Sequence, residues 1–416
     1  MSSVSSVTRD ASALASVRGL LVELRDRNPF YRQKLASVTA PPMPGSLSDF
    51  AARFPFTTKS ELVADQAAHP PYGTARSEPL PRFTRCHQTS GTTGAPLRWL
   101  DTPESWAAMT DDWVEVFRRA GLHSSDRVLM AFSFGPFLGF WLAFEASLRL
   151  GAMTIPGGGM NTALRARVLA ENACTVLCCT PTYALHLAET LKASPSGAAV
   201  SSIRLLVVAG EPGGSLPATR ARLSAAWPNA RIFDHHGMTE VGPVTHEDPD
   251  QSGNLIVLER SFYAEVVNPA TGSPVNPGES GELILTTLRR RACPLLRYRT
   301  GDLVRGAYTP SGFTLFGGIL GRVDDMIVIR GVNIYPSAIE EIIRAFPEIA
   351  EFRVTQDCRN ALPELRVEIE ADPTVAATLA NRFLADLALR IPVTAMPAGA
   401  LPRFDLKARR WIRLQD

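Results

Sequence analysis

The chain has 416 residues, which is too long for one compact core, so two or more domains are expected. Its apolar fraction of 45% and its charged fraction of 20% are those of an ordinary globular protein. A formal net charge of +2 favours neither nucleic acid nor an anionic membrane as a partner.

The six cysteines show no paired spacing that would indicate a disulfide framework, so we expect reduced thiols and a cytoplasmic protein. The N-terminus lacks a basic segment followed by an apolar one, and no secretion signal is expected. An uncharged run from Val128 to Phe144 is slightly short for a membrane span and carries Gly135-Pro136 near its middle. Because no basic cluster flanks this run, we expect a buried strand, a turn and the start of a helix there.

In chain order, residues up to about 80 begin with an amphipathic stretch and continue through proline-rich connections. Between about 85 and 235, apolar runs typical of β-strands alternate with helical stretches. The apolar runs are RVLMAFSF, GAMTIPGGG, TVLCCTPT and IRLLVVAGEP, and the helical stretches ALRARVLAEN and YALHLAETL lie among them. Such alternation predicts a parallel sheet covered by helices on both faces.

Beyond about residue 245, short alternating runs are separated by Asn-Pro, Gly-Ser-Pro and Pro-Gly turns, a pattern typical of antiparallel β structure. The last 90 residues or so predict a strand (MIVIR), a helix (SAIEEIIRAF), two strands (EFRVTQD and LRVEIEAD), a helix (LANRFLADLALRI, residues 379–391) and a basic tail. We therefore predict an α/β protein. Its large N-terminal domain, residues 1–323, would hold mostly parallel sheets flanked by helices and a small antiparallel β subdomain. A small α+β C-terminal domain would occupy residues 324–416.

Two loops gather small residues where phosphate groups could bind. The loop TSGTTGAP, from Thr89 to Pro96, combines hydroxyl groups with glycines, whose backbone amides can approach phosphate oxygens closely. It is not a Walker P-loop, because the Gly-Lys-Ser/Thr ending is absent, and a plain solvent loop is the alternative interpretation. The second loop, AGEPGG at residues 209–214, directly follows an apolar strand, where ligands of open α/β sheets bind.

Charged residues with nucleotide-binding chemistry follow these loops. The stretch DHHGMTEVG places Thr239 and Glu240 side by side, and a carboxylate near phosphates is a candidate magnesium ligand. Asp302 lies in the glycine turn of YRTGDL, where a carboxylate can accept hydrogen bonds from both ribose hydroxyls. Further along, GRVDDMIVIRGVNIYP adds an arginine and an acidic pair, and LPRFDLKARR places Lys407 in the tail.

In this order, the motifs resemble the adenylate-forming superfamily of acyl-CoA synthetases, and within it the phenylacetate–CoA ligase branch. The stretches FYRQKL, FPFTTKSEL, IPGGGM and RGVNIYPSAIEE resemble that branch, and the likeness extends over roughly residues 28–410. It implies a two-step reaction. A carboxylate attacks the α-phosphate of Mg-ATP, which gives an acyl-adenylate and pyrophosphate. The thiol of coenzyme A then displaces AMP and forms a thioester.

The resemblance also implies roles for single residues. The first loop would wrap the β- and γ-phosphates, and the second would line the adenine and the ribose. Thr239 would touch the α-phosphate, Glu240 would hold Mg²⁺, and Arg322 would lie near the ribose or a phosphate. The implied ATP-binding residues are Thr89, Ser90, Gly91, Thr92, Thr93, Gly94, Gly210, Glu211, Pro212, Asp234, Asp302 and Arg322.

The same resemblance makes the small C-terminal domain mobile, with Asp324 as its hinge. Lys407 on that domain would reach the substrate carboxylate and the α-phosphate during the first step. Its ammonium group would offset charge on both reacting groups, and its loss would cost on the order of 3 kcal/mol or more. The domain would exclude water during adenylation and then move so that the thiol can enter.

Three features depart from the family pattern. Ala95 stands where relatives usually carry a lysine, which removes one charge near the γ-phosphate. His236 stands where many relatives have an aromatic residue. It is either a stacking surface in the pocket wall or a titratable group near the acyl carboxylate, and we include it among the catalytic candidates. The Cys-x-Cys zinc element of some members is absent here, so no zinc is expected.

The acid pocket is implied to lie along the aromatic segment from Phe132 to Trp141, although core packing is the alternative for these rings. The segment holds no Asp or Glu that could bind an α-ammonium group. An aryl or arylacetic acid therefore fits best, and a medium-chain or polyketide-like acid is the alternative. The predicted pocket residues are Phe132, Phe134, Gly135, Phe137, Gly158 and Gly159.

Three functions remain open at this point. The first is an ATP-dependent acid–CoA ligase. The second performs the same adenylation but transfers the acyl group to a carrier-protein thiol or to an amine. The third is a degenerate nucleotide-binding protein, against which the joint presence of all the catalytic candidates argues. Expected partners are the acid, ATP and CoA, with an acyl carrier protein under the second function. No nucleic-acid or membrane partner is expected, and a homodimer is one option for the assembly.

Overall fold

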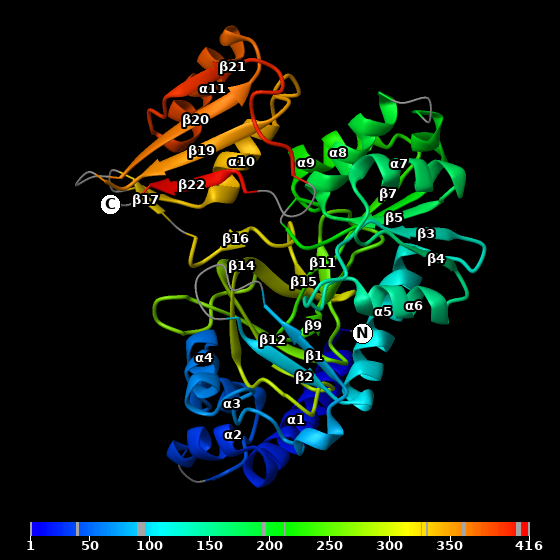
Figure 1. Ribbon diagram of the computed structural model, residues 1–416. Helices are drawn as coiled ribbons and strands as arrows, with labels where there is room; N and C mark the ends of the chain where they lie inside the picture. Colours follow the sequence, from blue (N-terminus) through cyan, green and yellow to red (C-terminus); the bar gives the residue numbers. More distant parts are fainter. Residues whose placement is uncertain are drawn as a thin grey trace. The chain divides into compact units, whose positions relative to one another are not determined.

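The contacts of the chain define two compact units in the computed structural model (Figure 1). Each unit is assembled from three stretches of sequence. Unit 1 comprises Met1–Asp126, Ser133–Thr154 and His235–Phe316, and unit 2 comprises Arg127–Phe132, Ile155–Asp234 and Gly317–Asp416. The residues that the structure describes are 2–38, 41–89, 96–193, 197–211, 213–325, 327–329, 332–359, 363–404 and 409–414.

Unit 1 begins with a group of helices that pack around buried aromatic and leucine side chains. Its helices are α1 (Ser2–Arg27), α2 (Pro29–Lys34), α3 (Leu47–Arg53), α4 (Lys59–Ala68), α5 (Pro103–Ala120) and α6 (Trp141–Arg149), with short 3₁₀ turns at Leu35–Ser37 and Leu80–Arg82. Helix α4 starts with a capping box, in which Thr58 and Glu61 satisfy each other's backbone N–H groups. This cap fixes the first turn of α4, which carries Lys59.

The strands of unit 1 are antiparallel, as the turn-rich sequence predicted. They are β1 (Arg85–Gln88), β2 (Arg98–Asp101), β8 (Gly237–Met238), β9 (Gly242–Pro243), β10 (Thr245–Glu247), β11 (Leu255–Val257), β12 (Phe262–Val267), β13 (Ser280–Thr287), β14 (Tyr298–Thr309) and β15 (Gly312–Leu315). The main sheet has the order β10-β11-β15-β14-β13-β12, whereas β1–β2 and β8–β9 form separate hairpin-like pairs.

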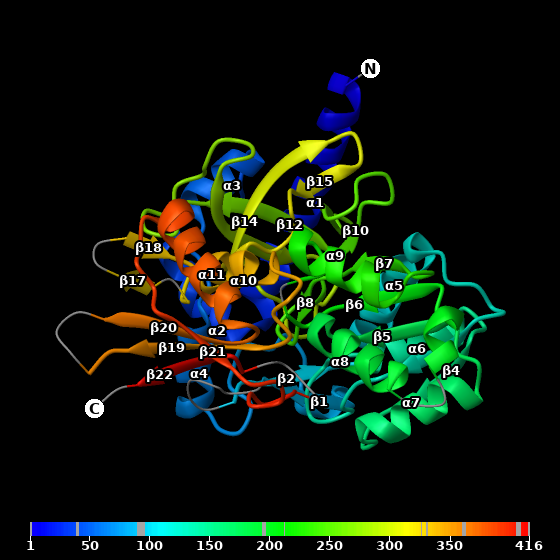
Figure 2. The same ribbon diagram turned by 90° about the horizontal axis from the view of Figure 1, so that it is seen from above.

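Unit 2 contains the parallel sheet that the alternating strand–helix pattern predicted. Its strand order is β4-β3-β5-β6-β7, and β3, β5, β6 and β7 pair in parallel register. In Figure 2 the helices α7, α8 and α9 lie alongside this sheet. The elements are β3 (Arg127–Met130), β4 (Met153–Pro156), α7 (Thr162–Glu171), β5 (Val176–Cys179), α8 (Pro181–Lys192), a 3₁₀ helix (Gly197–Ser202), β6 (Leu205–Val208), α9 (Pro217–Ala226) and β7 (Arg231–Asp234).

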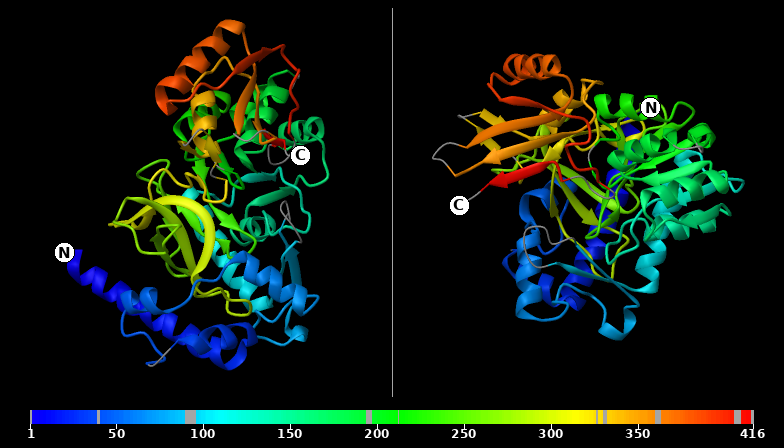
Figure 3. Two further views of the ribbon diagram at one scale, coloured as in Figure 1. Left: turned by 90° about the vertical axis from the view of Figure 1, so that its left-hand side faces the viewer. Right: turned by 45° about the horizontal axis from the view of Figure 1, so that its top comes forward.

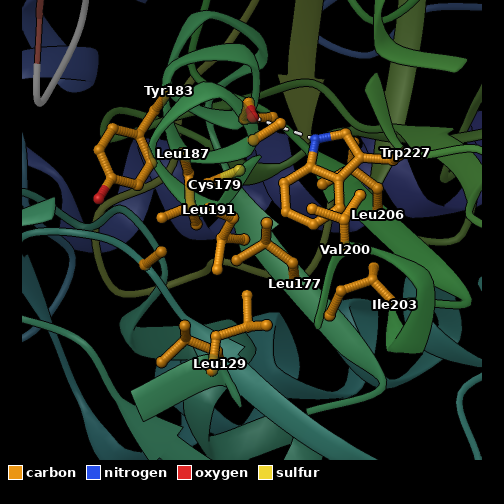
Figure 4. Close-up of a cluster of buried hydrophobic side chains, with 14 of the residues drawn as sticks. Leu129, Leu177, Cys179, Tyr183, Leu187, Leu191, Val200, Ile203, Leu206 and Trp227 are labelled. Atoms are coloured by element: carbon orange, nitrogen blue, oxygen red, sulfur yellow. Dashed lines mark hydrogen bonds between the residues drawn. The ribbon is translucent and has the colours of Figure 1, made fainter. Parts of the chain in front are cut away.

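The core of this sheet is a cluster of fully buried aliphatic and aromatic side chains (Figure 4). Leucines of β3, β5 and β6 pack there against residues of α8 and α9. Trp227, which ends α9, donates its indole N–H to the carbonyl oxygen of Ala184 on α8 over 3.0 Å. A buried tryptophan thus keeps its single polar atom satisfied while the ring fills the core.

The C-terminal part of unit 2 is a second, mixed sheet with helices packed against it (Figure 3). Its strand order is β21-β20-β19-β22, in which β19 and β20 are antiparallel and the two outer strands pair in parallel. The elements are β16 (Gly321–Arg322), β17 (Ile327–Ile329), β18 (Val332–Ile334), α10 (Pro336–Arg344), β19 (Phe352–Asp357), β20 (Glu364–Glu370), α11 (Pro373–Leu387), β21 (Val393–Met396) and β22 (Trp411–Leu414).

The strand predicted at MIVIR is confirmed as β17, which is one arm of the β17–β18 hairpin. The bounds predicted for the last helix need correction. The last helix was expected at residues 379–391, but α11 begins at Pro373, where the Asp372 side chain caps the Thr374 N–H, and it ends at Leu387. The basic tail also contains strand β22, whose burial is only partial and which therefore shows little hydrophobic pattern.

The uncharged run from Val128 to Phe144 folds as expected into a buried strand, a turn and the start of a helix. No helix in the described part of the chain is long and apolar enough to cross a membrane. All six cysteines are free thiols. Burial raises the pKa of Cys174 to about 11 and that of Cys293 to about 12, so both thiols stay protonated at neutral pH.

Candidate active site

The first predicted phosphate loop is described only at its two ends. Thr89 follows strand β1 and is buried. Its backbone N–H donates to the carbonyl oxygen of Leu97 over 3.0 Å, and its hydroxyl accepts from the Leu97 N–H over 3.1 Å. These two bonds close the base of the loop. The remaining predicted loop residues, Ser90, Gly91, Thr92, Thr93, Gly94 and Ala95, lie outside the described residues.

The second predicted loop follows β6 in unit 2. Gly210 has a φ of 94°, a conformation that favours glycine. Glu211 accepts a hydrogen bond over 2.7 Å from the backbone N–H of Thr182 in the first turn of α8. A carboxylate at a helix N-terminus compensates the free N–H groups there, so Glu211 also holds this loop against α8. Pro212 lies outside the described residues.

Asp234, at the end of β7, hydrogen-bonds to the same loop. Its carboxylate is buried and accepts a hydrogen bond from the Ser215 hydroxyl over 2.6 Å. Gly214 lies directly against this carboxylate, where any Cβ atom would overlap the Asp234 side chain. Asp234 therefore fixes the course of the loop as well as lying near the carboxyl end of the sheet.

Thr239 and Glu240 occupy the turn between β8 and β9 in unit 1. The carbonyl oxygen of Thr239 accepts a hydrogen bond over 2.7 Å from the Arg290 guanidinium. Arg290 is itself held by Asp101 through two hydrogen bonds of 2.8 and 2.6 Å, and both side chains are almost fully buried. A buried ion pair thus anchors the turn that presents the Thr239 hydroxyl and the Glu240 carboxylate.

The Glu240 carboxylate is buried, with 5% of the residue exposed. Its Oε1 atom lies 3.1 Å from Nζ of Lys59 and 3.5 Å from the hydroxyl of Tyr298. Lys59 begins α4, and about half of its side chain is exposed. Lys59 lies in the stretch FPFTTKSEL, for which the sequence indicated no role in the site. The one signal that could have directed attention to another cation was Ala95, which stands where relatives usually carry a lysine.

The chemistry of this carboxylate fits Mg²⁺. The Lys59 ammonium at 3.1 Å shows that the environment of Oε1 accommodates a positive charge. The described residues contain no group of three or more His, Cys, Asp or Glu side chains that could hold a metal ion. One carboxylate is sufficient for Mg²⁺, which commonly binds one or two protein carboxylates together with substrate phosphates.

His236 faces Asp302, which the resemblance assigned to the ribose. Nε2 of His236 lies 3.1 Å from Oδ2 of Asp302, and 16% and 5% of the two side chains are exposed. The preceding residue, His235, is buried against Trp113 and hydrogen-bonds the Thr245 carbonyl oxygen over 2.6 Å. Burial lowers the pKa of His235 to about 3, so this imidazole is neutral. The sequence did not predict the contact between His236 and Asp302.

The aromatic segment of the predicted acid pocket is only partly buried. The Phe134 ring meets the rings of Trp141 and Phe144 edge to face, with centroids 4.8 and 5.7 Å away. The Trp141 indole donates to the Gly135 carbonyl oxygen over 3.2 Å, and 36% of Trp141 is exposed. Phe134, Gly135 and Phe137 belong to unit 1, whereas Phe132, Gly158 and Gly159 belong to unit 2. Gly159 is exposed and the other five are partly exposed.

The predicted hinge residue is exposed. Asp324 has 67% of its side chain exposed and binds Arg322 through two contacts of 3.0 and 3.2 Å. Arg322, the predicted ribose or phosphate ligand, would have to exchange this local pairing for a nucleotide. Lys407 lies outside the described residues.

Comparison with known proteins supplies the class of the molecule. Residues 87–287 match the family model of AMP-binding enzymes, and residues 331–414 match that of the AMP-binding enzyme C-terminal domain. The phenylacetate-coenzyme A ligase of Escherichia coli K12 is 32% identical over 409 residues, covering 93% of this chain and 91% of that protein. The enzyme of the same name from Thermus thermophilus is 29% identical, covering 93% of this chain and 92% of that protein.

Solved structures of similar proteins also belong to acid–CoA ligases. A 2-hydroxyisobutyryl-CoA ligase in its postadenylation state, in complex with R3-HIB-AMP, has a TM-score of 0.91 and 27% identity, covering 98% of this chain and 90% of that one. The same ligase with 2-HIB-AMP and CoA in the thioesterification state has a TM-score of 0.73 and 28% identity at the same coverage.

The chain therefore belongs to the family of adenylate-forming, AMP-binding enzymes. Within that family it is an AMP-forming acid–CoA ligase of the phenylacetate–CoA ligase-like branch, which works through an acyl-adenylate. The family and the α/β fold class predicted from the motifs are confirmed.

Proposed function

We propose that this ligase activates an aryl or arylacetic acid with Mg-ATP at the Thr239–Glu240 turn and transfers the acyl group to coenzyme A. The buried Glu240 carboxylate, held 3.1 Å from the Lys59 ammonium, is the observation that carries this proposal. Such a pair offers one acceptor for a metal ion and one cation for phosphate oxygens. Both charges are suited to a polyphosphate ligand.

In the first step, the substrate carboxylate attacks the α-phosphate and pyrophosphate leaves. The Thr239 hydroxyl would donate to an α-phosphate oxygen, and Arg290 fixes the backbone that presents it. Lys407 would place its ammonium between the two anionic reactants, which otherwise repel each other. Bound at Glu240, Mg²⁺ would supply charge neutralisation at the phosphates. Catalysis then depends on positioning and electrostatic stabilisation.

The remaining predicted nucleotide-binding residues complete this proposal. Asp302 would accept hydrogen bonds from the ribose hydroxyls, and the loop at Gly210 and Glu211 would line the adenine. Thr89 to Gly94 would wrap the β- and γ-phosphates. Asp234 would contribute by fixing the second loop through Ser215, and Arg322 would approach the ribose or a phosphate once freed from Asp324.

The predicted domain boundary becomes part of this proposal: residues 1–323 bind ATP and acid, and residues 324–416 carry Lys407. The family model of the C-terminal domain begins at residue 331, seven residues beyond Asp324. The Asp324 side chain is 67% exposed and pairs with Arg322, two residues away, so rotation of the backbone at this position would disturb few buried side-chain contacts among the described residues. Both facts support a hinge at Asp324.

An aryl or arylacetic acid is favoured because partly exposed aromatic rings occur along the predicted pocket segment and the similar proteins include phenylacetate-coenzyme A ligases. The 2-hydroxyisobutyryl-CoA ligase of similar structure makes a short branched hydroxy acid the competing class. Coenzyme A is the favoured acceptor because these relatives are named as coenzyme A ligases.

The test is pyrophosphate release from Mg-ATP with aryl, arylacetic, aliphatic and short hydroxy acids, with and without CoA. Release with an aryl or arylacetic acid and a CoA-dependent thioester is the expected result. Release only with a hydroxy or aliphatic acid would overturn the substrate class. Release without thioester would move the acceptor to a carrier-protein thiol or an amine. Absence of release with every acid would favour a degenerate, nucleotide-binding relative.

A further inference from the structure

The backbone that carries His236 is fixed on both sides. The N–H of His236 donates to the Thr245 hydroxyl over 3.0 Å. Its carbonyl oxygen accepts from the N–H groups of Val244 and Thr245 over 2.9 and 3.2 Å. Thr245 is fully buried on β10. The imidazole of His236 therefore projects from a rigid support, and its direction is set by χ rotations alone.

Asp302 is held with similar firmness on the long strand β14. Its backbone N–H donates to the Thr300 hydroxyl over 3.0 Å, and that hydroxyl donates to the Leu283 carbonyl oxygen over 2.8 Å. Only 5% of the Asp302 side chain is exposed. A buried carboxylate needs hydrogen-bond donors to remain ionised.

The two side chains meet at Nε2 of His236 and Oδ2 of Asp302, which are 3.1 Å apart and shielded from solvent. The distance suits a hydrogen bond, but the present orientation of the imidazole is not aligned with one. Among the described residues, Nε2 forms no other hydrogen bond. A buried imidazole N–H without a hydrogen bond costs free energy. A small rotation of the ring that completes the hydrogen bond to Asp302 is therefore favourable.

We propose that His236 is a positioning residue of the ribose site, and this inference rests on the proposed role of Asp302 in binding ribose. Nε2–H of His236 donates to Oδ2 of Asp302 and thereby turns Oδ1 toward the two ribose hydroxyls. Neighbouring His235 is neutral and hydrogen-bonded to Thr245, so it does not compete for the Asp302 carboxylate.

This role differs from both interpretations that the sequence allowed. A stacking wall needs only a flat ring, which phenylalanine supplies as well as histidine. A titratable group near the acyl carboxylate would act on the acid and leave the ribose unaffected. A donor to Asp302 instead predicts that His236 matters only when the nucleotide carries ribose hydroxyls. The ligand class concerned is a ribonucleotide, and its 2′,3′-dideoxy analogue removes the groups that Asp302 recognises.

The experiment is equilibrium binding of Mg-ATP and of Mg-2′,3′-dideoxyATP to the full-length chain. The wild type is expected to prefer ATP. In His236→Phe the affinity for ATP should fall roughly tenfold, as expected for the loss of a hydrogen bond to a charged group, while that for dideoxyATP stays unchanged. His236→Gln, which keeps a donor near the Nε2 position, should retain most of the preference. Asp302→Asn should lose it.

The matched control is His69→Phe. His69 and Asp65 also form a histidine–aspartate pair, with Nδ1 and Oδ1 3.3 Å apart. His69 directly follows α4, and 59% of its side chain is exposed. This variant should bind both nucleotides as the wild type does. An unchanged preference for ATP in His236→Phe would overturn the inference, and so would an equal loss of affinity for both nucleotides.

Failure of the proposed function would give a different result from failure of the His236 inference. A wild type that binds ATP but releases no pyrophosphate with any acid would reject the ligase chemistry and leave the binding comparison intact. A preference for ATP that survives Asp302→Asn would reject the ribose role of Asp302, and His236 would lose its proposed role with it.

Discussion

Two buried charge clusters, one in each unit, differ in how completely their carboxylates are satisfied. In unit 2, Glu351 receives two hydrogen bonds from Arg410, of 2.5 and 3.0 Å, and Arg410 also donates to the Thr182 hydroxyl over 3.2 Å. In unit 1, Glu240 is met by the half-exposed Lys59 at one oxygen and by a Tyr298 hydroxyl at 3.5 Å.

The difference teaches how to separate a structural ion pair from a ligand site. The Glu351 carboxylate is held at both oxygens by Arg410 and accepts a further hydrogen bond over 2.8 Å from the Phe352 N–H, so its charge is already compensated within the fold. Glu240 keeps acceptor capacity, and its cationic partner can move because much of the Lys59 chain is in solvent. We therefore expect substitutions in the first cluster to change stability and substitutions in the second to change nucleotide chemistry.

The largest effect is expected for Arg410→Ala. Removing the guanidinium takes away both of the hydrogen bonds that it donates to the buried Glu351 carboxylate, which should lower the free energy of unfolding by about 3–5 kcal/mol. Thermal and denaturant unfolding of the full chain would measure this loss. Arg167→Ala is the matched control, because the Arg167–Glu171 pair on α7 is 3.9 Å long and exposed, and such pairs contribute about 1 kcal/mol or less. Equal stability of the two variants would break the comparison.

A loss of about 3 kcal/mol, or roughly two orders of magnitude in rate, is expected for adenylation by Lys407→Ala. Thiolysis of a supplied acyl-adenylate should be largely spared, because the ammonium acts on the carboxylate and the α-phosphate. The two half-reactions would be measured separately, as pyrophosphate release and as thioester formation from the adenylate. Lys192→Ala, at the exposed end of α8, is the control. Equal damage to both half-reactions would contradict this division.

Lys59→Ala sharpens the comparison at the Glu240 cluster. Loss of its ammonium should raise KM for ATP roughly tenfold without changing thermal unfolding, since the side chain is half exposed. If Lys59 supplies the charge that is missing at Ala95, the double variant Lys59→Ala/Ala95→Lys should recover most of the affinity. Absence of recovery would mean that Lys59 acts by positioning Glu240. A drop in unfolding temperature would place Lys59 with the structural cluster instead.

The smallest effect concerns acid stability. Two hydrogen bonds from Arg403 hold the pKa of Glu370 down at about 2. Because the folded-state pKa lies below the ordinary value of 4.5, the stabilisation is present above pH 4.5 and is lost as the pH falls toward 2. Arg403→Ala should therefore flatten the dependence of the denaturant midpoint on pH between about 4.5 and 2. A slope identical to that of the wild type would rule out Arg403 as the cause.

Local sequence determined much of the architecture. The strands β3, β4, β5 and β6 and the helices α7 and α8 lie where apolar runs and helical stretches alternate, because periodicity and burial are properties of neighbouring residues. The turn residues beyond about residue 245 likewise predicted the antiparallel region. The order of the motifs was sufficient to predict the family, and residue types alone marked Thr239 and Glu240 as candidates for binding phosphate and magnesium.

Tertiary structure alone decided the pairings. Lys59 meets Glu240, and His236 meets Asp302, across long separations in the chain that no local pattern encodes. Strand β22 was hidden in a basic tail because its identity comes from parallel pairing with β19 and not from its own hydrophobicity. Residue types thus specified which chemistry the chain carries, whereas the fold decided which charges share a site, since long-range contacts form only when the sheets bring distant segments together.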